Sequence, residues 1–206
     1  MPKLYIVGIG PGSKDYLTAA ALNAVQKSDV VFGSKRALNL FDIDSPKIHL
    51  NAKKIKESLK NAITRAETDE NVSILSTGDP GFSGILKPIL NLNSNIEIEV
   101  IPGISSIQLC AAKLKIPWDE ANIVTMHGKG ISENILEIIN NGKPSIILPN
   151  FKITDLTHFL IEKGISGERK VAVCEKLGYD DEKIVKTSLK DISKMNFSYM
   201  SILVIY

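Results

Sequence analysis

Hydrophobic and polar positions follow two different patterns along this chain. Short runs of aliphatic residues end in glycine and proline, and longer stretches carry an apolar residue at every third or fourth position. The short runs predict buried β-strands, and the longer spacing predicts amphipathic helices. In the first half of the chain the two kinds alternate, which is typical of a parallel α/β sheet. We expect the strands at 3–9, 29–32, 72–76 and 96–101, and the helices at 18–28, 55–66 and 104–114.

The second half has a different order of elements. Strands are expected at 122–126 and 145–148, helices at 131–140 and 154–163, and three further strands near 171, 184 and 202. Consecutive strands at the end indicate a mixed sheet. The segment KIPWDE (115–120) interrupts the pattern between the halves. The predicted fold is therefore α/β with two domains, a parallel-sheet N-terminal domain over 1–116 and a mixed-sheet C-terminal domain over 117–206.

Glycine-rich loops follow three of the strands predicted in the first half. Their sequences are GIGPGS, STGDPGFSG and IPGISS. Because the carboxyl ends of parallel strands meet at one edge of a sheet, we expect these loops to lie together there and to form a binding crevice. Glycine lets a ligand approach the backbone closely.

The first loop invites comparison with the dinucleotide-binding fingerprint, but it departs from that pattern. Ser13 stands where the third glycine is needed, and the second strand ends in Phe32-Gly33-Ser34 without the required acidic residue. The phosphate-binding pattern G-x-x-x-x-G-K-[ST] is also absent from the sequence. These departures disfavour a nicotinamide-dependent enzyme and indicate a ligand without a pyrophosphate.

Two side chains are candidates for chemistry. Asp79 precedes a proline at a strand end, where an aspartate either forms a turn or accepts a hydrogen bond from a ligand. His127 lies in a loop just after the expected domain boundary, where a histidine commonly bonds to backbone. Either residue could act as an acid or base, or orient a substrate.

Composition and charge exclude some classes of function. Hydrophobic residues make up 44% of the 206 residues and charged residues 23%, close to the usual mix for a globular protein. A net charge of +2 argues against nucleic acid and anionic membrane surfaces as partners. The short basic clusters Lys35-Arg36 and Lys53-Lys54 are either solvated helix ends or the lining of a pocket for a polycarboxylate.

The cysteines and the hydropathy bear on location. Cys110 and Cys174 lack metal-ligand spacing and lie in apolar surroundings, so we expect buried, reduced thiols and no metal site. That expectation fits a reducing cytoplasm. No run approaches the ~20 apolar residues of a membrane helix, and no signal peptide is visible.

Taken together, three segments resemble the tetrapyrrole (corrin/porphyrin) methylase family in order and spacing. They are LYIVGIGPGSKDYLTAAALNAVQKSDVVFGSKR, STGDPGFSG and VIPGISSIQLCAAKLKIPW. Within the family the chain most resembles the cobalt-precorrin-7 C(5)-methyltransferase group, which also forms the N-terminal half of precorrin-6Y C(5,15)-methyltransferases. The segments that indicate this group are IPWDEANIVTMHGKG and VAVCEKLGYDDEKIVKTSL.

The resemblance implies a C-methyltransferase that uses S-adenosyl-L-methionine, yields S-adenosyl-L-homocysteine and acts on a corrin-type tetrapyrrole in cobalamin biosynthesis. It implies a homodimer, with the cofactor in a cleft between the two domains. The C(15)-methylating, decarboxylating activity would then lie on a separate polypeptide.

Matched motifs carry the family's cofactor contacts onto specific positions of this chain. From the three loops these are Gly10, Pro11, Thr77, Gly78, Asp79, Phe82, Ser105 and Ser106. The second domain would add Pro149, in a segment that departs from the Tyr-Met-Gly-like sequence of many relatives, and Gly178. Carboxylates of the macrocycle would suit the cations Lys35, Arg36 and Lys129.

Other readings of the same motifs remain open. The acceptor could be another corrin carbon, uroporphyrinogen, a diphthamide precursor or ribosomal RNA. A methylase-like module that binds a ligand without catalysis would share the same loops.

Overall fold

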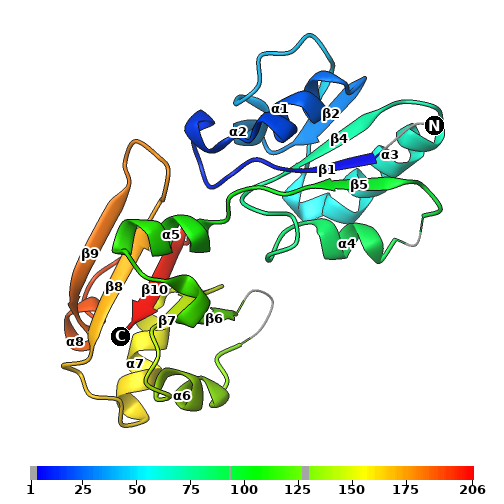
Figure 1. Ribbon diagram of the computed structural model, residues 1–206. Coiled ribbons are helices and arrows are strands. Elements are labelled where there is room, and N and C mark those ends of the chain that lie inside the picture. The colour runs from blue at the N-terminus through cyan, green and yellow to red at the C-terminus, as the bar shows by residue number, and fades with distance from the viewer. Residues whose placement is uncertain (1–3, 93, 127–129) are drawn as a thin grey trace. The chain divides into compact units, whose positions relative to one another are not determined.

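The computed structural model describes residues 4–92, 94–126 and 130–206. The chain divides into two compact units, Met1–Ser105 and Ser106–Tyr206, and each unit is built around its own sheet (Figure 1).

The first unit contains a five-stranded sheet in the order β3-β2-β4-β1-β5, and every neighbouring pair is parallel. This confirms the parallel sheet that the alternating pattern predicted. A short strand, β3, joins the four that were predicted, because its three residues are too few and too polar to show in a hydrophobic pattern. The strands are β1 (Leu4–Gly8), β2 (Val30–Gly33), β3 (Lys47–His49), β4 (Val72–Ser76) and β5 (Ile98–Ile101).

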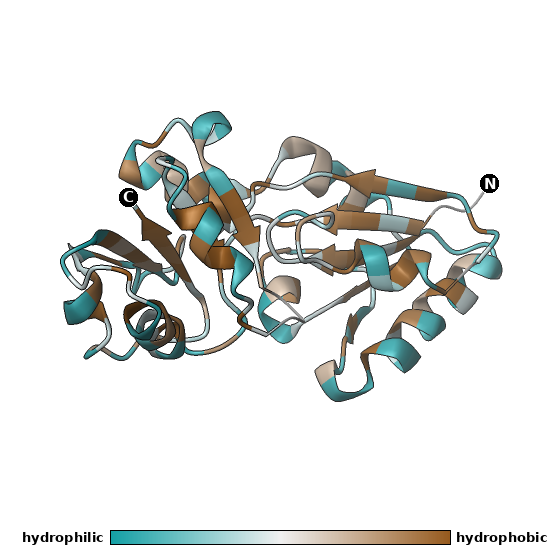
Figure 2. Ribbon diagram, turned by 90° about the horizontal axis from the view of Figure 1, so that it is seen from below, coloured by the Kyte–Doolittle hydropathy of each residue, from teal (hydrophilic) through white to brown (hydrophobic). Residues whose placement is uncertain are grey.

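Helices cover both faces of this sheet, so the unit has three layers (Figure 1). Successive side chains of a strand point to opposite faces. Ile6 and Ile74 accordingly pack in the cluster that includes α3 and α4, whereas Val7 and Leu75 pack in the cluster that includes α1 and α2. Burial on both faces explains why the strands β1, β2 and β4 are almost continuously hydrophobic (Figure 2). The helical segments are α1 (Ala19–Gln26), α2 (Lys35–Leu38), α3 (Ile55–Glu67), α4 (Leu86–Leu90) and the 3₁₀ turns η1 (Lys14–Tyr16) and η2 (Ala52–Lys54).

The helix α3 shows how the apolar spacing produces this packing. Leu59, Ala62, Ile63 and Ala66 recur at helical intervals and are buried, and the rest of the helix is mostly exposed. Burying a side chain the size of Leu59 contributes about 1.5–3 kcal/mol.

The second unit contains a five-stranded sheet in the order β6-β7-β10-β8-β9. The β6–β7 pair is parallel and the other pairs are antiparallel, which confirms the predicted mixed sheet. The strands are β6 (Asn122–Thr125), β7 (Ser145–Leu148), β8 (Lys170–Glu175), β9 (Lys183–Ser188) and β10 (Ser201–Ile205).

Helices also cover this second sheet. One hydrophobic cluster joins α6, α7 and α8 to the strands. Among the described residues of both units, no helix is both long and apolar enough to cross a membrane. The helical segments are α5 (Ser106–Leu114), α6 (Asn134–Ile139), α7 (Ile153–Glu162), α8 (Leu189–Ile192) and the 3₁₀ turn η3 (Trp118–Glu120).

The division between the units lies before α5, earlier than the boundary expected after residue 116. The physical reason is that α5 packs on the second sheet, against β7 and β10. The Sγ atom of Cys110 on α5 lies 3.4 Å from that of Cys174 on β8, and both thiols are free and buried as expected. The contact with Cys174 and burial together raise the pKa of the Cys110 thiol above its ordinary value.

Candidate functional site

The three glycine-rich loops leave the first sheet from adjacent strands. The loops follow β1, β4 and β5, and these strands are neighbours in the order β4-β1-β5. All three strands run in the same direction, so the loops begin at one edge of the sheet (Figure 1). This arrangement confirms that the three motifs meet, and that edge is the ordinary ligand-binding position of a parallel α/β sheet.

The loops touch one another through their backbones. The N–H of Gly78 donates to the carbonyl of Gly10 at 2.8 Å. A Cβ atom added to Gly8 would lie 2.5 Å from the nitrogen of Gly103, and one added to Gly103 would lie 2.4 Å from the oxygen of Gly78. Glycine is therefore required at these positions so that the loops can pack against each other.

Left-handed backbone conformations bring the first two loops into this contact. Gly10 has a φ of 73° and Gly78 a φ of 69°, in the region that glycine adopts without steric cost. From the sequence, the glycines were expected to let a ligand approach the backbone, and Gly8 and Gly103 were not singled out. The signal was present, because both residues belong to the motifs that predicted the loops.

Asp79 holds the second loop to the third. Its Oδ1 accepts the N–H of Gly81 at 2.8 Å, and its Oδ2 accepts the N–H of Gly103 at 3.1 Å. Hydrogen bonds to a charged acceptor are stronger than those between neutral groups. The carboxylate therefore positions backbone, and its assignment as an acid, base or cofactor contact stays a prediction.

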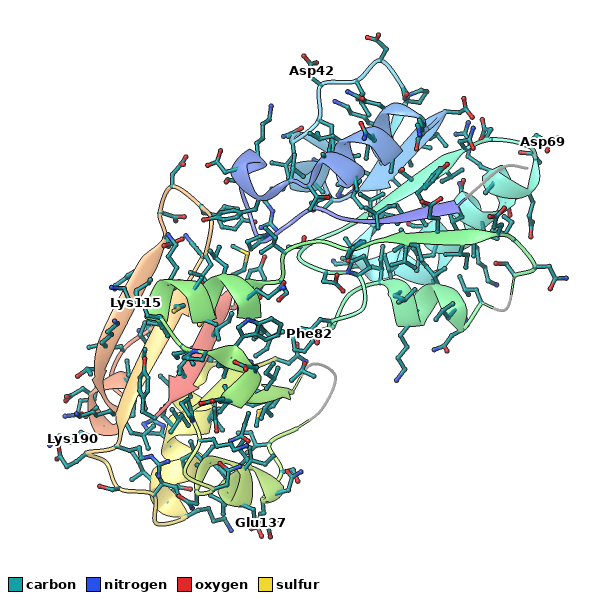
Figure 3. All side chains as sticks on the ribbon, in the orientation of Figure 1. Asp42, Asp69, Phe82, Lys115, Glu137 and Lys190 are labelled. Atoms are coloured by element: carbon teal, nitrogen blue, oxygen red, sulfur yellow. The ribbon has the colours of Figure 1, made fainter. Side chains whose placement is uncertain are left out.

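The other predicted residues of the first unit lie on the same loops. Pro11 follows Gly10 directly, and Thr77 precedes Gly78 with an exposed side chain. Phe82 lies farther along the second loop, where its N–H donates to the carbonyl of Asp79 at 3.3 Å (Figure 3).

Ser105 and Ser106 stand where the third loop passes into α5, and the division between the two units falls between them. Whether they contact a cofactor stays a prediction.

The predicted residues of the second unit follow strands that end at one edge of its sheet. The strands β7 and β8 are both antiparallel to β10, so they run in the same direction, and Pro149 follows the first and Gly178 the second. The strand β6 is parallel to β7 and ends at that edge too. His127 and Lys129 lie outside the described residues.

Gly178 belongs to a turn that Glu182 stabilises. Gly178 has a φ of 80°, and its N–H donates to Oε2 of Glu182 at 2.9 Å. The Nζ atom of Lys113 lies 2.8 Å from the other carboxylate oxygen. Burial alone would raise the pKa of Glu182, but the N–H of Gly178 and the ammonium group of Lys113 outweigh it and leave that pKa below its ordinary value. This contact joins α5 to a turn far along the chain, and no local pattern in the sequence indicates it.

The groups at the edge of the first sheet can bind a ligand mainly through hydrogen bonds. The loops offer backbone amides and carbonyls together with the hydroxyl group of Thr77, which is exposed. Such groups match an adenosyl sulfonium compound, whose ribose, adenine and amino-acid parts bind through hydrogen bonds. The residues therefore fit S-adenosylmethionine.

Comparisons with known proteins agree with this geometry. The family model for tetrapyrrole (corrin/porphyrin) methylases matches residues 3–193. A protein of Methanocaldococcus jannaschii, described as "Probable cobalt-precorrin-7 C(5)-methyltransferase", is 46% identical over 98% of this chain and 96% of its own length. The crystal structure of a precorrin-6Y methylase from Archaeoglobus fulgidus aligns with 98% of this chain and 97% of its own chain, with a TM-score of 0.75 and a sequence identity of 26%.

A third relative shares the fold. It is the uroporphyrin-III C-methyltransferase of Thermus thermophilus, whose structure was solved with S-adenosylhomocysteine. The alignment covers 98% of this chain and 91% of the other chain, with a TM-score of 0.80 and a sequence identity of 19%.

The chain belongs to the tetrapyrrole (corrin/porphyrin) methylase family. It is accordingly a methyltransferase that depends on S-adenosylmethionine, as the three loop motifs indicated.

The packing of the loops predicts a cost for any side chain at their contact. We expect Gly8→Ala to lower the free energy of unfolding by about 1–3 kcal/mol, because the new methyl group forces neighbouring backbone apart. Thermal unfolding measures the loss, and titration with S-adenosylhomocysteine should show weaker binding.

Gly130→Ala is the matched control, because a Cβ atom there meets no described heavy atom within 4 Å. Unfolding and binding that are unchanged in Gly8→Ala would contradict the tight packing.

The lowered pKa of Glu182 predicts a dependence of stability on pH. A carboxyl whose pKa is lowered by folding stabilises the protein fully above its unfolded-state pKa, and this contribution is lost as the pH falls through the folded-state value. We therefore expect the melting temperature of the wild type to fall more steeply than that of Glu182→Gln as the pH drops below the ordinary glutamate value of 4.5.

Glu137→Gln, which changes an exposed glutamate on α6, serves as the control and should follow the wild-type curve (Figure 3). Parallel curves for the wild type and Glu182→Gln would refute the assignment.

Proposed function

We propose that this methyltransferase adds a methyl group to C(5) of cobalt-precorrin-7, a corrin-ring precursor in cobalamin biosynthesis. The observation that carries the proposal is the 46% identity to a relative of that name over nearly the full length of both chains. The precorrin-6Y methylase structure, which aligns over 98% of this chain, supports the same reaction.

The chemistry asks little of the side chains. S-adenosylmethionine supplies a methyl group that is already electrophilic because it is bonded to a sulfonium. The backbone groups around Gly10 and Gly78, with the hydroxyl of Thr77, would bind the co-substrate and orient it toward the ring carbon. Positioning of this kind can lower a barrier by ~7–11 kcal/mol.

A proton must be removed or relocated when a ring carbon gains a methyl group. His127 and Asp79 are the candidates for that transfer. Both carboxylate oxygens of Asp79 accept backbone N–H groups, which favours a positioning role for Asp79 and leaves His127 as the preferred acid or base.

The wider setting follows from the same assignment. We propose that the protein acts as a homodimer in the cytoplasm, without membrane or nucleic acid as a partner. A separate polypeptide would carry out the C(15) methylation and decarboxylation.

Co-substrate binding is the first property to measure. Calorimetric titration with S-adenosylhomocysteine should show saturable binding, and a parallel titration with NAD should show none, because the first loop lacks the dinucleotide fingerprint. A folded sample that binds NAD instead would overturn the proposal.

Turnover then identifies the acceptor. Mass spectrometry should detect one added methyl group on cobalt-precorrin-7 and not on neighbouring intermediates. Methylation of a different intermediate would keep the reaction class and change the acceptor carbon.

Two variants separate the binding of the co-substrate from proton transfer. Asp79→Asn should weaken the binding of S-adenosylhomocysteine about tenfold, because the amide lacks one of the two acceptor oxygens that bind backbone. His127→Ala should leave that affinity unchanged and lower kcat about 10²-fold or more.

Calorimetry and steady-state kinetics measure the two effects. Near-normal turnover in both variants would show that neither residue is the acid or base.

A further inference from the structure

Two thiols lie in contact inside the second unit. Cys110 belongs to α5 and Cys174 to β8, and both side chains are fully buried, with 0% of their surface exposed. Their Sγ atoms lie 3.4 Å apart, and the Cys110 thiol donates a weak hydrogen bond to the Cys174 sulfur. Because the two residues are 64 positions apart in the sequence, the contact is a product of the tertiary fold.

The sheet determines where the Cys174 thiol points. Cys174 pairs with Ile202 on β10 and with Ile184 on β9. The adjacent Val173 and Leu203 pack in the cluster with α6, α7 and α8, so the alternation of side chains along a strand places Cys174 on the other face of the sheet. The helix α5 packs on that face (Figure 1). The two thiols therefore meet between α5 and the sheet.

The surroundings of the pair favour a disulfide over a metal site. Within the described part of the chain, no third histidine, cysteine, aspartate or glutamate joins the two thiols to form a metal-binding group. A structural zinc site takes four such ligands. Both thiols are free, and small shifts of the two side chains bring the sulfur atoms from 3.4 Å to the roughly 2.05 Å of a covalent bond.

One thiol of the pair is better suited to react first. The hydrogen bond from Cys110 lowers the pKa of the Cys174 thiol, and Lys186 on β9 lowers it further, against the opposing effects of burial and of Glu182. The same contact raises the pKa of the Cys110 thiol. Because the thiolate is the nucleophilic form, Cys174 is the sulfur that attacks an oxidant.

We propose that Cys110 and Cys174 form a modification site at which hydrogen peroxide converts the two thiols reversibly into a disulfide. The Cys174 thiolate attacks one oxygen of the peroxide, the O–O bond breaks and hydroxide leaves, which gives a sulfenic acid. The Cys110 sulfur then attacks the sulfenic sulfur, the S–S bond forms, and the sulfenic oxygen leaves as water with the Cys110 proton. In total the pair loses two electrons and two protons, and the peroxide is reduced to two molecules of water.

Burial and the redox state of the compartment determine when this reaction occurs. Since neither thiol is exposed, peroxide reaches the pair when α5, a helix of nine residues, opens locally from the sheet. Disulfides in a reducing compartment are usually transient and redox-sensing. The dithiol of this structure is then the resting state, and the disulfide is the state that follows exposure to the oxidant.

The disulfide fixes an arrangement that the fold already has. An ion pair between Lys113 and Glu182 holds α5 to the turn between β8 and β9, and the S–S bond adds a covalent connection from α5 to β8. A bond across 64 positions removes much of the conformational entropy of the unfolded chain. The third loop leads directly into α5, so the modification acts on the helix to which that loop is attached.

Peptide mapping and thermal unfolding of the purified, folded protein test the proposal. After treatment with hydrogen peroxide, titratable thiols should fall from two to none, and a map under non-reducing conditions should contain the peptides of Cys110 and Cys174 joined to each other. The melting temperature should rise by roughly 5–15 °C. Dithiothreitol should reverse each change by thiol–disulfide exchange. The test needs no ligand, so its outcome is independent of the proposed function.

Cys110→Ser and Cys174→Ser are the matched controls, because each keeps a hydrogen-bonding group of similar size and leaves one sulfur without a partner. Each variant is compared before and after peroxide, so a lower starting stability does not affect the comparison, and neither should gain melting temperature. If a serine variant fails to fold, the wild type treated with peroxide and then with dithiothreitol provides the same comparison.

Other outcomes overturn the proposal. Two thiols that remain titratable after treatment would show that the pair does not react in the folded protein. Sulfinic or sulfonic acid at either cysteine, or a disulfide between two chains, would show that the two sulfurs do not bond to each other. An internal disulfide that leaves the melting temperature unchanged would show that it does not stabilise the packing of α5 on β8.

Discussion

The site depends on a backbone contact that side chains would prevent. Gly8 and Gly103 lie so close that a Cβ atom on either would meet the backbone of another loop. This proximity follows from the sheet, in which β1 lies between β4 and β5. Because all three strands are parallel, their loops emerge together and must share one small volume.

Asp79 complements this steric requirement with charge. Glycines allow the loops to approach, but flexible glycine loops lose much conformational entropy when they are fixed. The carboxylate of Asp79 accepts N–H groups from Gly81 within its own loop and from Gly103 in the next. One side chain thereby orders two loops before a ligand binds, which reduces the ordering cost of binding.

The sequence predicted what depends on local pattern. Buried strands such as 72–76 appear as aliphatic runs, and the loops appear as glycine motifs, so the parallel sheet and the meeting of the loops could both be inferred. The short elements β3, α2, α4 and α8 were missed because three to five residues carry too little periodicity. Contacts between distant positions also left no local trace, as with Arg36 and Thr77 or Cys110 and Cys174. The boundary differed because α5 follows a loop of the first unit in sequence but packs on the second sheet.

The place where the units divide has a thermodynamic consequence. The residues between β5 and α5 form the third loop, and the same short segment is the covalent connection between the units. Its backbone therefore has two functions. At Gly103 it forms part of the loop cluster, where its N–H donates to Asp79, and the following residues connect the first unit to α5. A ligand that restricts the dihedral angles of this loop also restricts the connection. Ligand occupancy and the conformational freedom of the connection are then coupled through the entropy of a few shared residues.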